Sequence, residues 1–255
     1  MINLSLCIEP LFKAYAMADR IKLAADAGYK AVEFWDPSGK DLQQMASVAV
    51  SNNVQFAACT LSEPRKFPLD KSSDLVTENV RRSIEIAQEI DCPTMIGLSS
   101  DISGRSDSQK NILIENLKRI ADLLVKADKT LIIEALNSLV NHKGYYLDNS
   151  AVAFEIVKCV NCPNIKVLYD VYHMQIMEGN LVSNITEHIE WIGHFHTAGV
   201  PGRHEPINNE IDYPYIMKQI RLLEYKHYVG LEYWPTYDER ESIEDSYRHL
   251  SGETH

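Results

Sequence analysis

The sequence lacks several features that would place it in other classes of protein. It has no excess of basic residues, because 25 Lys and Arg stand against 36 Asp and Glu, which gives a formal net charge of −11 at pH 7. A chain this acidic is not expected to bind nucleic acid or an anionic membrane surface. No apolar run approaches the roughly 18 residues that a membrane-spanning helix needs. These absences leave a small molecule as the expected partner.

Cysteine is scarce and scattered. The chain has 5 cysteines, an odd number without the spacing of a disulfide framework, which predicts reduced thiols in a cytoplasmic protein. Cys159 and Cys162 form a CxxC pair, but no second pair accompanies it, so we assign it no zinc or redox role. The first ten residues contain neither a basic stretch nor a long apolar stretch, and we therefore expect no signal peptide.

Strand patterns and helical patterns alternate along the whole chain, with no linker or low-complexity segment between them. Predicted strands cover residues 3–8, 31–35, 54–61, 94–98, 130–136, 166–170, 192–197 and 228–234. Predicted helices cover residues 13–27, 41–51, 73–89, 107–127, 149–160, 213–223 and 239–250, and residues 185–190 are predicted to be part of a short helix. Eight βα units of roughly 32 residues match the usual length of a (β/α)₈ TIM barrel, so one α/β barrel domain is predicted over residues 1–255. An open doubly wound sheet is the alternative, but the early strands end in IEPLF and FWDPSG instead of a Gly-rich turn.

Four consecutive predicted strands carry ionisable side chains at their ends, where a barrel of this type has its active site. These side chains are Glu134, Asp170, His196 and Glu232. Because side chains alternate along a strand, the first three are predicted to point toward the barrel axis. A single acid at a strand end is more often a solvated loop residue, whereas four at matched positions favour a site. Three carboxylates inside a barrel are costly without a cation, and this ligand set suits Mg²⁺, Mn²⁺, Co²⁺ or Zn²⁺.

The loops that follow these strands add polar side chains, namely Asn137, His142, His173 and Arg203. Arg203 has the planar fork that binds a carboxylate through two hydrogen bonds, although an exposed loop arginine is an equally good interpretation. His194 lies one layer deeper than His196 and is predicted to be a hydrogen-bonded core residue. Glu33 lies across the barrel from these strands, and the sequence assigns it no role.

Several motifs in the second half of the chain resemble one known family. YDVYHMQIMEGN at 169–180 resembles the sixth-strand motif of the hydroxypyruvate isomerases, as do AGVPGRHEP at 198–206 and EIDYPY at 210–215. EALN at 134–137 with GYYL at 144–147 resembles the same family's fifth loop. The wider group is the xylose isomerase-like barrels, which include ketose 3-epimerases and 2-oxo-tetronate isomerases. Two residues depart from the family pattern, because His196 and Ala135 stand where close members often have Gln and Pro.

The resemblance implies a divalent metal held by Glu134, Asp170, His196 and Glu232, with the two glutamates as the acid–base pair. The departure at His196 makes metal binding more credible, because imidazole is the stronger ligand, while both departures weaken the case for hydroxypyruvate itself as substrate. His173, Arg203, Asn137 and His142 are then the candidates for binding the substrate.

Together the residues and the resemblance predict a metal-assisted isomerase of a small hydroxy-oxo acid or sugar. In this chemistry a base removes a proton beside a carbonyl, an enediolate forms, and an acid returns a proton to the neighbouring carbon. A ketose 3-epimerase or a 2-oxo-tetronate isomerase is the main alternative. A metal-dependent hydrolase or endonuclease is less favoured, and a non-catalytic sugar-binding barrel would not need three carboxylates. The sequence leaves open the substrate, the metal and whether the chain forms a homo-oligomer.

Overall fold

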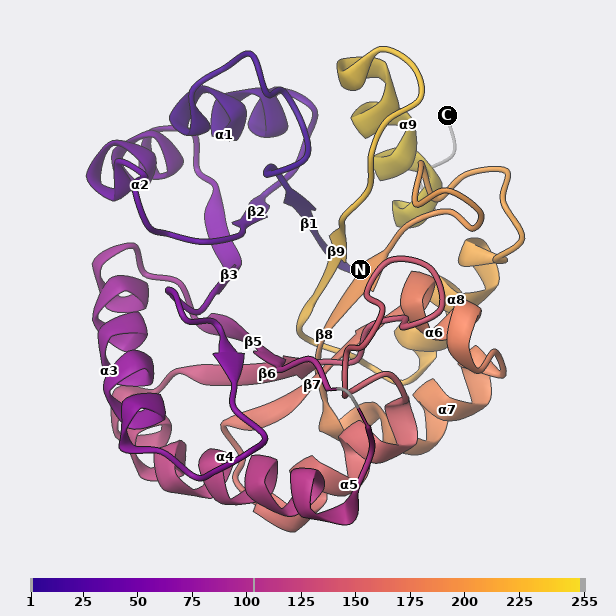
Figure 1. The fold of residues 1–255 in the computed structure, drawn as a ribbon. Helices are drawn as coiled ribbons and strands as arrows, with labels where there is room; N and C mark the ends of the chain where they lie inside the picture. Colours follow the sequence, from indigo (N-terminus) through magenta and orange to yellow (C-terminus); the bar gives the residue numbers. More distant parts are fainter. Residues whose placement is uncertain (1, 103, 253–255) are drawn as a thin grey trace.

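The computed structural model describes residues 2–102 and 104–252. Within them, eight parallel strands form a closed barrel with helices around its outside (Figure 1). The strands are β1 (Asn3–Cys7), β2 (Ala31–Phe34), β3 (Gln55–Thr60), β5 (Thr94–Ser99), β6 (Thr130–Glu134), β7 (Ile165–Asp170), β8 (Ile192–Thr197) and β9 (Tyr228–Leu231). Neighbouring strands pair in the order β3-β2-β1-β9-β8-β7-β6-β5, and the pairing of β3 with β5 closes the ring. The predicted (β/α)₈ barrel is therefore confirmed.

Helices follow the barrel strands in turn along the chain. They are α1 (Met17–Asp26), α2 (Leu42–Ser51), α3 (Asp74–Glu89), α4 (Asp107–Ala127), α5 (Ser150–Val160), α7 (Leu181–His188), α8 (Tyr213–Leu222) and α9 (Glu239–Ser251). Two short elements were not predicted, because each is too short to show a periodic pattern: β4 (Lys66–Phe67) and α6 (Val171–Met177). The end of the helical segment predicted at 185–190 is a separate 3₁₀ helix, η1 (Ile189–Trp191). α6 begins directly after β7 and so folds back beside the end of that strand.

One predicted helix start was wrong, and backbone conformation explains it. The helix predicted at 13–27 begins only at Met17, because Ala16 directly before it has an extended backbone with a ψ of 152°. Residues 185–190 were predicted to be part of a short helix, and the structure shows that this helix begins at Leu181, directly after Asn180, whose φ is 49°. A residue with extended or left-handed backbone cannot continue a helix, and hydrophobic periodicity does not reveal such residues.

The barrel interior holds a small apolar layer below the strand ends. It consists of Ala58, Ile96, Ile132 and Leu168, which are buried against one another. The opposite faces of the strands pack on the surrounding helices in the main hydrophobic core. This confirms that Ile132 and Leu168 point to the axis, as strand alternation predicts. The next inward positions toward the carboxyl ends of β6 and β7 are Glu134 and Asp170, so the interior changes there from aliphatic to ionisable.

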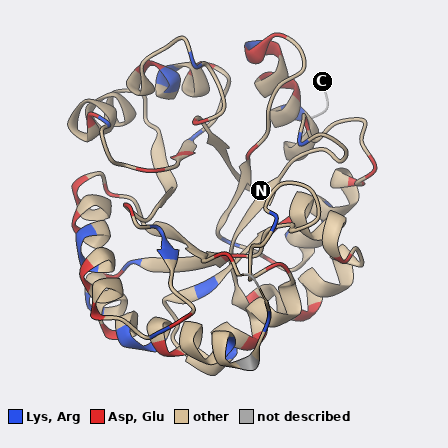
Figure 2. Cartoon of the chain, viewed as in Figure 1, with Lys and Arg blue, Asp and Glu red and all other residues tan. Residues whose placement is uncertain are grey.

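Charged side chains of both signs are interspersed along the outer helices α3 and α4 (Figure 2). Examples are the ion pairs Arg119–Asp74 at 2.7 Å and Lys110–Glu155 at 2.6 Å. Exposed pairs of this kind contribute only about 0–1 kcal/mol each to stability. In the described residues, every helix is too short or too polar to cross a bilayer. The ionisable groups with the most unusual surroundings lie instead inside the barrel.

Candidate active site

Four ionisable side chains converge at the carboxyl ends of β6, β7, β8 and β9. Glu134 and Asp170 are the last residues of their strands, His196 is the last but one of β8, and Glu232 follows β9 directly. Asp170 pairs with His196 in the strand register, so their side chains stand beside each other on the inner face. Each of the four residues offers one ligand atom, and these atoms all lie within 4.8 Å of one another. The structure thus brings together the residues that the strand ends predicted.

The spacing and burial of this cluster suit a divalent cation. Two ligands on opposite sides of an ion, at about 2.1 Å each, are about 4.2 Å apart, so the observed spread needs only a small contraction. Glu134 and His196 are only 6% and 3% exposed. Glu134 Oε1 and His196 Nδ1 lie 3.5 Å apart, and neither has a hydrogen-bond partner in the described part of the chain. A cation between them would satisfy both atoms, so this donor set fits a metal.

Protons and a cation compete for the same cluster. Burial raises the pKa of Asp170 to about 7; Arg203 and His196 oppose this rise, and Glu134 and Glu232 add to it. Burial alone would lower the pKa of His196, but attraction to Glu33 and Glu232 outweighs it and raises the pKa well above its usual value. A buried group of like charges therefore takes up protons to lower its net charge. A divalent ion would relieve the same excess of negative charge.

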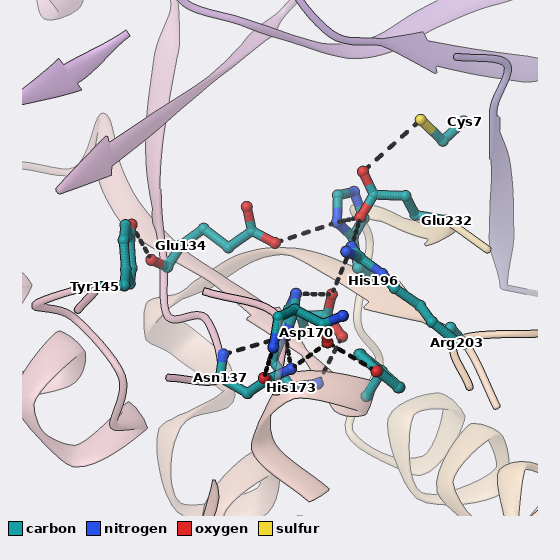
Figure 3. A network of polar contacts seen from close by, with 12 residues as sticks. Cys7, Glu134, Asn137, Tyr145, Asp170, His173, His196, Arg203 and Glu232 are labelled. Carbon is teal, nitrogen blue, oxygen red and sulfur yellow. Dashed lines mark hydrogen bonds and ion pairs between the residues drawn. The ribbon is translucent and has the colours of Figure 1, made fainter. Parts of the chain in front are cut away.

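The two glutamates differ in how they are held. Glu232 Oε1 accepts a 2.6 Å hydrogen bond from the indole of Trp35, and its Oε2 accepts one from Arg203. Both carboxylate oxygens of Glu232 are therefore engaged by donors, whereas Glu134 Oε1 has no hydrogen-bond partner in the described chain. Figure 3 shows the two carboxylates reaching toward His196 from opposite sides. Of the two glutamates, Glu134 is thus the one with a carboxylate oxygen that no protein donor occupies.

Arg203 is buried between two aromatic rings, so the alternative of an exposed loop arginine was wrong. Its guanidinium lies 5.5 Å from the ring centre of Tyr172 and 5.1 Å from that of Trp234. One nitrogen, Nη2, bonds Glu232 and lies 3.8 Å from Asp170 Oδ2. Arg203 is 9% exposed, and its Nε has no hydrogen-bond partner among the described residues. Arg203 therefore places a fixed positive charge beside the acidic cluster.

His173 is held as a neutral hydrogen-bond donor. Asp170 Oδ1 accepts from the backbone N–H of His173 at 3.1 Å, which caps α6 and brings the imidazole back beside the strand end. The backbone N–H of Asn137 donates to His173 Nδ1 at 3.2 Å, so the ring proton must lie on Nε2. Burial, with help from Arg203, lowers the pKa of His173 well below its usual value. The nitrogen that carries this proton, Nε2, lies 3.5 Å from Asp170 Oδ2, on the side of the cluster.

Asn137 and His142 differ in what their side chains contact. The Asn137 amide lies 2.6 Å from His173 Nδ1 and 2.9 Å from Asn141 Oδ1, and the side chain is fully buried. Asn137 therefore orients His173 within the protein. The ring centre of His142 lies 5.3 Å from that of His173, and its Nε2 has no hydrogen-bond partner in the described chain. Of the two, His142 has the polar atom that is free for a ligand.

Sequence reasoning missed the contribution of the first strands. Glu33 accepts hydrogen bonds from His194 Nε2 at 3.1 Å and from His196 Nε2 at 2.9 Å, which confirms His194 as a hydrogen-bonded core residue. Trp35, just beyond β2, holds Glu232. The only sequence signal was Glu33 itself, a charged residue inside the otherwise apolar run AVEFW. Its partners stand about 160 residues later, and no local pattern identifies them.

Comparison with known proteins agrees with this geometry. A family described as "Xylose isomerase-like TIM barrel" matches residues 21–252. The chain is 31% identical over 253 residues to the hydroxypyruvate isomerase of Escherichia coli (strain K12), a match that covers 92% of this chain and 94% of the relative. It is 30% identical over 238 residues to the 2-oxo-tetronate isomerase of Pectobacterium atrosepticum, covering 89% of this chain and 90% of that one.

One solved structure is similar over nearly the whole chain. It is a crystal structure described as "AP endonuclease, family 2" from Brucella melitensis, with a TM-score of 0.89 and 28% sequence identity. The match covers 95% of this chain and 97% of that one. The barrel and the order of its elements are therefore shared well beyond the motifs around the strand ends.

Proposed function

The chain belongs to the xylose isomerase-like TIM barrel family, and on this premise we propose that it is a metal-assisted isomerase of a small hydroxy-oxo acid. The observation that supports this proposal most strongly is the buried cluster, in which ligand atoms of three carboxylates and one imidazole lie within 4.8 Å of one another. The names of the two relatives, hydroxypyruvate isomerase and 2-oxo-tetronate isomerase, support this class of substrate. Hydroxypyruvate is the first candidate, and a 2-oxo-tetronate, one carbon longer, is the second.

In this proposal Glu134, Asp170, His196 and Glu232 hold the metal. A bound divalent ion would supply a Lewis acid that polarises the substrate carbonyl and stabilises negative charge on the enediolate oxygens. Three carboxylates favour a hard ion such as Mg²⁺ or Mn²⁺, while the imidazole is also a suitable ligand for Co²⁺ and Zn²⁺.

In this proposal Glu134 and Glu232, on opposite sides of the cluster, transfer the protons. For hydroxypyruvate, the reaction moves one proton from C3 to C2 and the hydroxyl proton from O3 to O2, so that the ketone becomes an aldehyde. If the metal takes only Oε1 of Glu134, the other oxygen of that carboxylate remains to remove the C3 proton. Glu232 is placed to return a proton to C2 from the other side. His173 can donate its Nε2–H to a substrate oxygen, and burial keeps that ring neutral.

Arg203 provides the cation that an acidic substrate needs. Its guanidinium stays charged at any working pH, so it can bind a carboxylate but cannot act as the base. The rings of Tyr172 and Trp234 hold it in one plane, which suits a two-bond contact with a carboxylate. An uncharged ketose gains less from this group, and so Arg203 favours the oxo-acid over a ketose 3-epimerase reaction.

Replacing Arg203 with Ala is expected to raise KM for hydroxypyruvate by about 10- to 100-fold, because a charge-assisted hydrogen bond is worth about 1.5–3 kcal/mol. For an uncharged ketose the rise should be several-fold smaller. Arg203→Lys is the matched control, since it keeps the charge but loses the fork, and it should recover only part of the affinity. Steady-state kinetics on both substrates measure the split. Equal losses on acidic and uncharged substrates would remove the carboxylate-binding role.

The proposed function is tested directly by a substrate and metal screen. Protein treated with EDTA is incubated with hydroxypyruvate, a 2-oxo-tetronate or free ketoses in D₂O, with and without Mn²⁺, and followed by proton NMR. We expect conversion of an oxo-acid that depends on the added metal and places deuterium on the reacting carbons. Inversion at C3 of a ketose without turnover of the acids would instead identify a 3-epimerase. No conversion of any of them would overturn the proposal.

A nuclease function has less support, although the Brucella structure is named as an endonuclease. A nuclease must attract a polyanion, and this chain carries a net charge of −11. Basic and acidic residues are interspersed over α3 and α4 (Figure 2), so neither helix carries basic residues alone. The acidic cluster itself would also repel a phosphodiester unless metal had already filled it.

A further inference from the structure

Glu33 lies below the four-residue cluster and accepts hydrogen bonds from three side chains. Ser5 Oγ donates to its Oε1 at 2.7 Å, while His194 Nε2 and His196 Nε2 lie 3.1 and 2.9 Å from its Oε2. The side chain is 1% exposed. Glu33, His194 and His196 are close enough to be considered a second metal site. Glu33 is, however, already satisfied by these donors, so we interpret the group as a hydrogen-bond network.

This network determines which nitrogen of His196 faces the acidic cluster. An ionised carboxylate only accepts hydrogen bonds, so the His196 nitrogen that contacts Glu33, Nε2, must carry a proton. The other nitrogen, Nδ1, lies 3.5 Å from both Glu134 Oε1 and Glu232 Oε2. Once a metal has displaced any proton there, Nδ1 has the lone pair that a metal ligand needs. A free imidazole would divide itself between two tautomers, and only one of them is useful here.

We propose that Glu33 is a positioning residue, which fixes the Nε2–H tautomer and the ring orientation of His196 so that Nδ1 can bind the metal ion. The inference rests on the proposed function, because it concerns the metal that the function requires. A carboxylate that orients a metal-binding histidine in this way typically contributes 10- to 100-fold to metal affinity. Glu33 would not contact the substrate, and its effect would pass entirely through His196.

Gly230 provides a second, independent observation, because it leaves the space that Glu33 occupies. It pairs with His196 across the β8–β9 register and with Ser5 across the β1–β9 register. A Cβ added at this glycine would lie 2.1 Å from Glu33 Oε1, 2.9 Å from His194 Nε2 and 2.9 Å from His196 Cδ2. Any larger residue at this position of β9 would push the carboxylate off both histidines. The close approach of strand and network therefore requires glycine here.

The test is the metal affinity of Glu33→Gln, measured by titrating the metal-free protein with Mn²⁺ or Zn²⁺ against a chromophoric chelator. We expect the Kd to rise by about 10- to 100-fold. Gly230→Ala should raise it as well, although it changes no ionisable group. Glu178→Gln is the matched control, since Glu178 accepts hydrogen bonds from Asn149, Ser150 and Asn184 outside the site. Its Kd should stay within about twofold of the wild type, the scatter expected of an independent site.

A spectroscopic measurement separates positioning from general stability. In ¹⁵N-histidine-labelled protein saturated with Zn²⁺, the signals of His196 should show a proton on Nε2 and the metal on Nδ1. Glu33→Gln should mix or reverse this pattern, because an amide can also donate to the ring. Wild-type affinity and an unchanged His196 pattern in both variants, or zinc bound through Nε2, would overturn the role of Glu33 and leave the proposed function standing. A wild-type protein that binds neither metal would overturn the metal-assisted function and this inference with it.

Discussion

Replacing Glu134 with Gln is expected to lower kcat at least about 100-fold and to leave the protein folded. The magnitude is the usual scale for the loss of a general acid or base. Gln has nearly the shape of Glu, and the Glu134 backbone carbonyl that accepts from Tyr145 is unchanged. Glu134 Oε1 has no hydrogen-bond partner among the described residues, so the amide breaks no hydrogen bond at that atom. Steady-state kinetics with saturating Mn²⁺, with circular dichroism as the check on folding, measure the effect.

Exchange of the substrate's carbon-bound proton with solvent shows which step is lost. If Glu134 removes the proton from C3, Glu134→Gln should lose both exchange and net conversion. Glu232→Gln should also lower kcat by about 100-fold or more. It should nevertheless keep exchange at C3, because removal of the first proton does not need Glu232. Proton NMR of hydroxypyruvate in D₂O reports exchange and conversion in the same sample.

Loss of the metal would imitate the loss of a base, so each variant's affinity for Mn²⁺ must be measured alongside its kinetics. Asp41→Asn is a suitable control, because Asp41 caps α2 at an exposed position. Near-normal turnover in both glutamine variants would contradict the acid–base assignment and restrict the glutamates to ligand or structural roles. The mechanism would then have to be built around His173, whose Nε2 lies 3.5 Å from Asp170 Oδ2.

The four-residue cluster was predictable because its signal is local. Side chains alternate along a strand, so a charged residue two positions after an inward aliphatic residue must also face the axis. Ile132 and Leu168 in the barrel interior, with Glu134 and Asp170 above them, follow this rule. Parallel strands in a closed barrel then bring their carboxyl ends to one mouth whatever the loops do. Predicting the fold and the cluster required only strand periodicity and the order of elements along the chain.

The surroundings of the cluster were not predictable, because they depend on contacts between distant parts of the chain. Glu33 forms a hydrogen bond with His196, which is 163 residues later in the chain, and Trp35 forms one with Glu232, which is 197 residues later. Both contacts exist only because β1 joins β2 to β9 when the ring closes. The burial of Arg203 likewise depends on aromatic neighbours from separate segments, Tyr172 of α6 and Trp234 after β9. Sequence patterns describe one strand or helix at a time and contain no information on contacts between residues far apart in the chain.

Replacing Asp170 with Asn is expected to weaken binding of the metal by about 100-fold or more, beyond the usual cost of changing a residue behind the ligands. Asp170 also caps α6 through the oxygen that accepts from the His173 backbone N–H. Asn caps a helix about as well as Asp, so this second role should survive the change. The variant thus separates the charge of Asp170 from its structural contact. Activity should fall with metal occupancy.

The same substitution is expected to stabilise the metal-free protein at high pH. The pKa of Asp170 is raised to about 7 in the folded protein, against about 3.9 in an unfolded chain. A raised folded pKa means that the stability contributed by the bound proton is fully present below about pH 4 and is lost as the pH rises through about 7. Asn cannot ionise and does not suffer this loss. Metal-free Asp170→Asn should therefore be the more stable protein at pH 8, by up to about 1.4 kcal/mol for each pKa unit of the shift.

With metal bound, the wild type should instead be more stable than Asp170→Asn, because the metal stabilises the folded wild type far more than the variant. A ligand at 100 times its Kd adds about 2.7 kcal/mol to the free energy of unfolding, and the weakened variant gains little at the same concentration. Urea unfolding at pH 8 and at pH 4, each with EDTA or with Mn²⁺, measures all the combinations. With EDTA, the advantage of the variant should shrink from pH 8 toward pH 4. If Asp170→Asn were instead the less stable protein at pH 8 in EDTA, Asp170 would contribute more through its contacts than its buried charge costs. The cluster would then be a structural ion network, with no need of a metal to balance it.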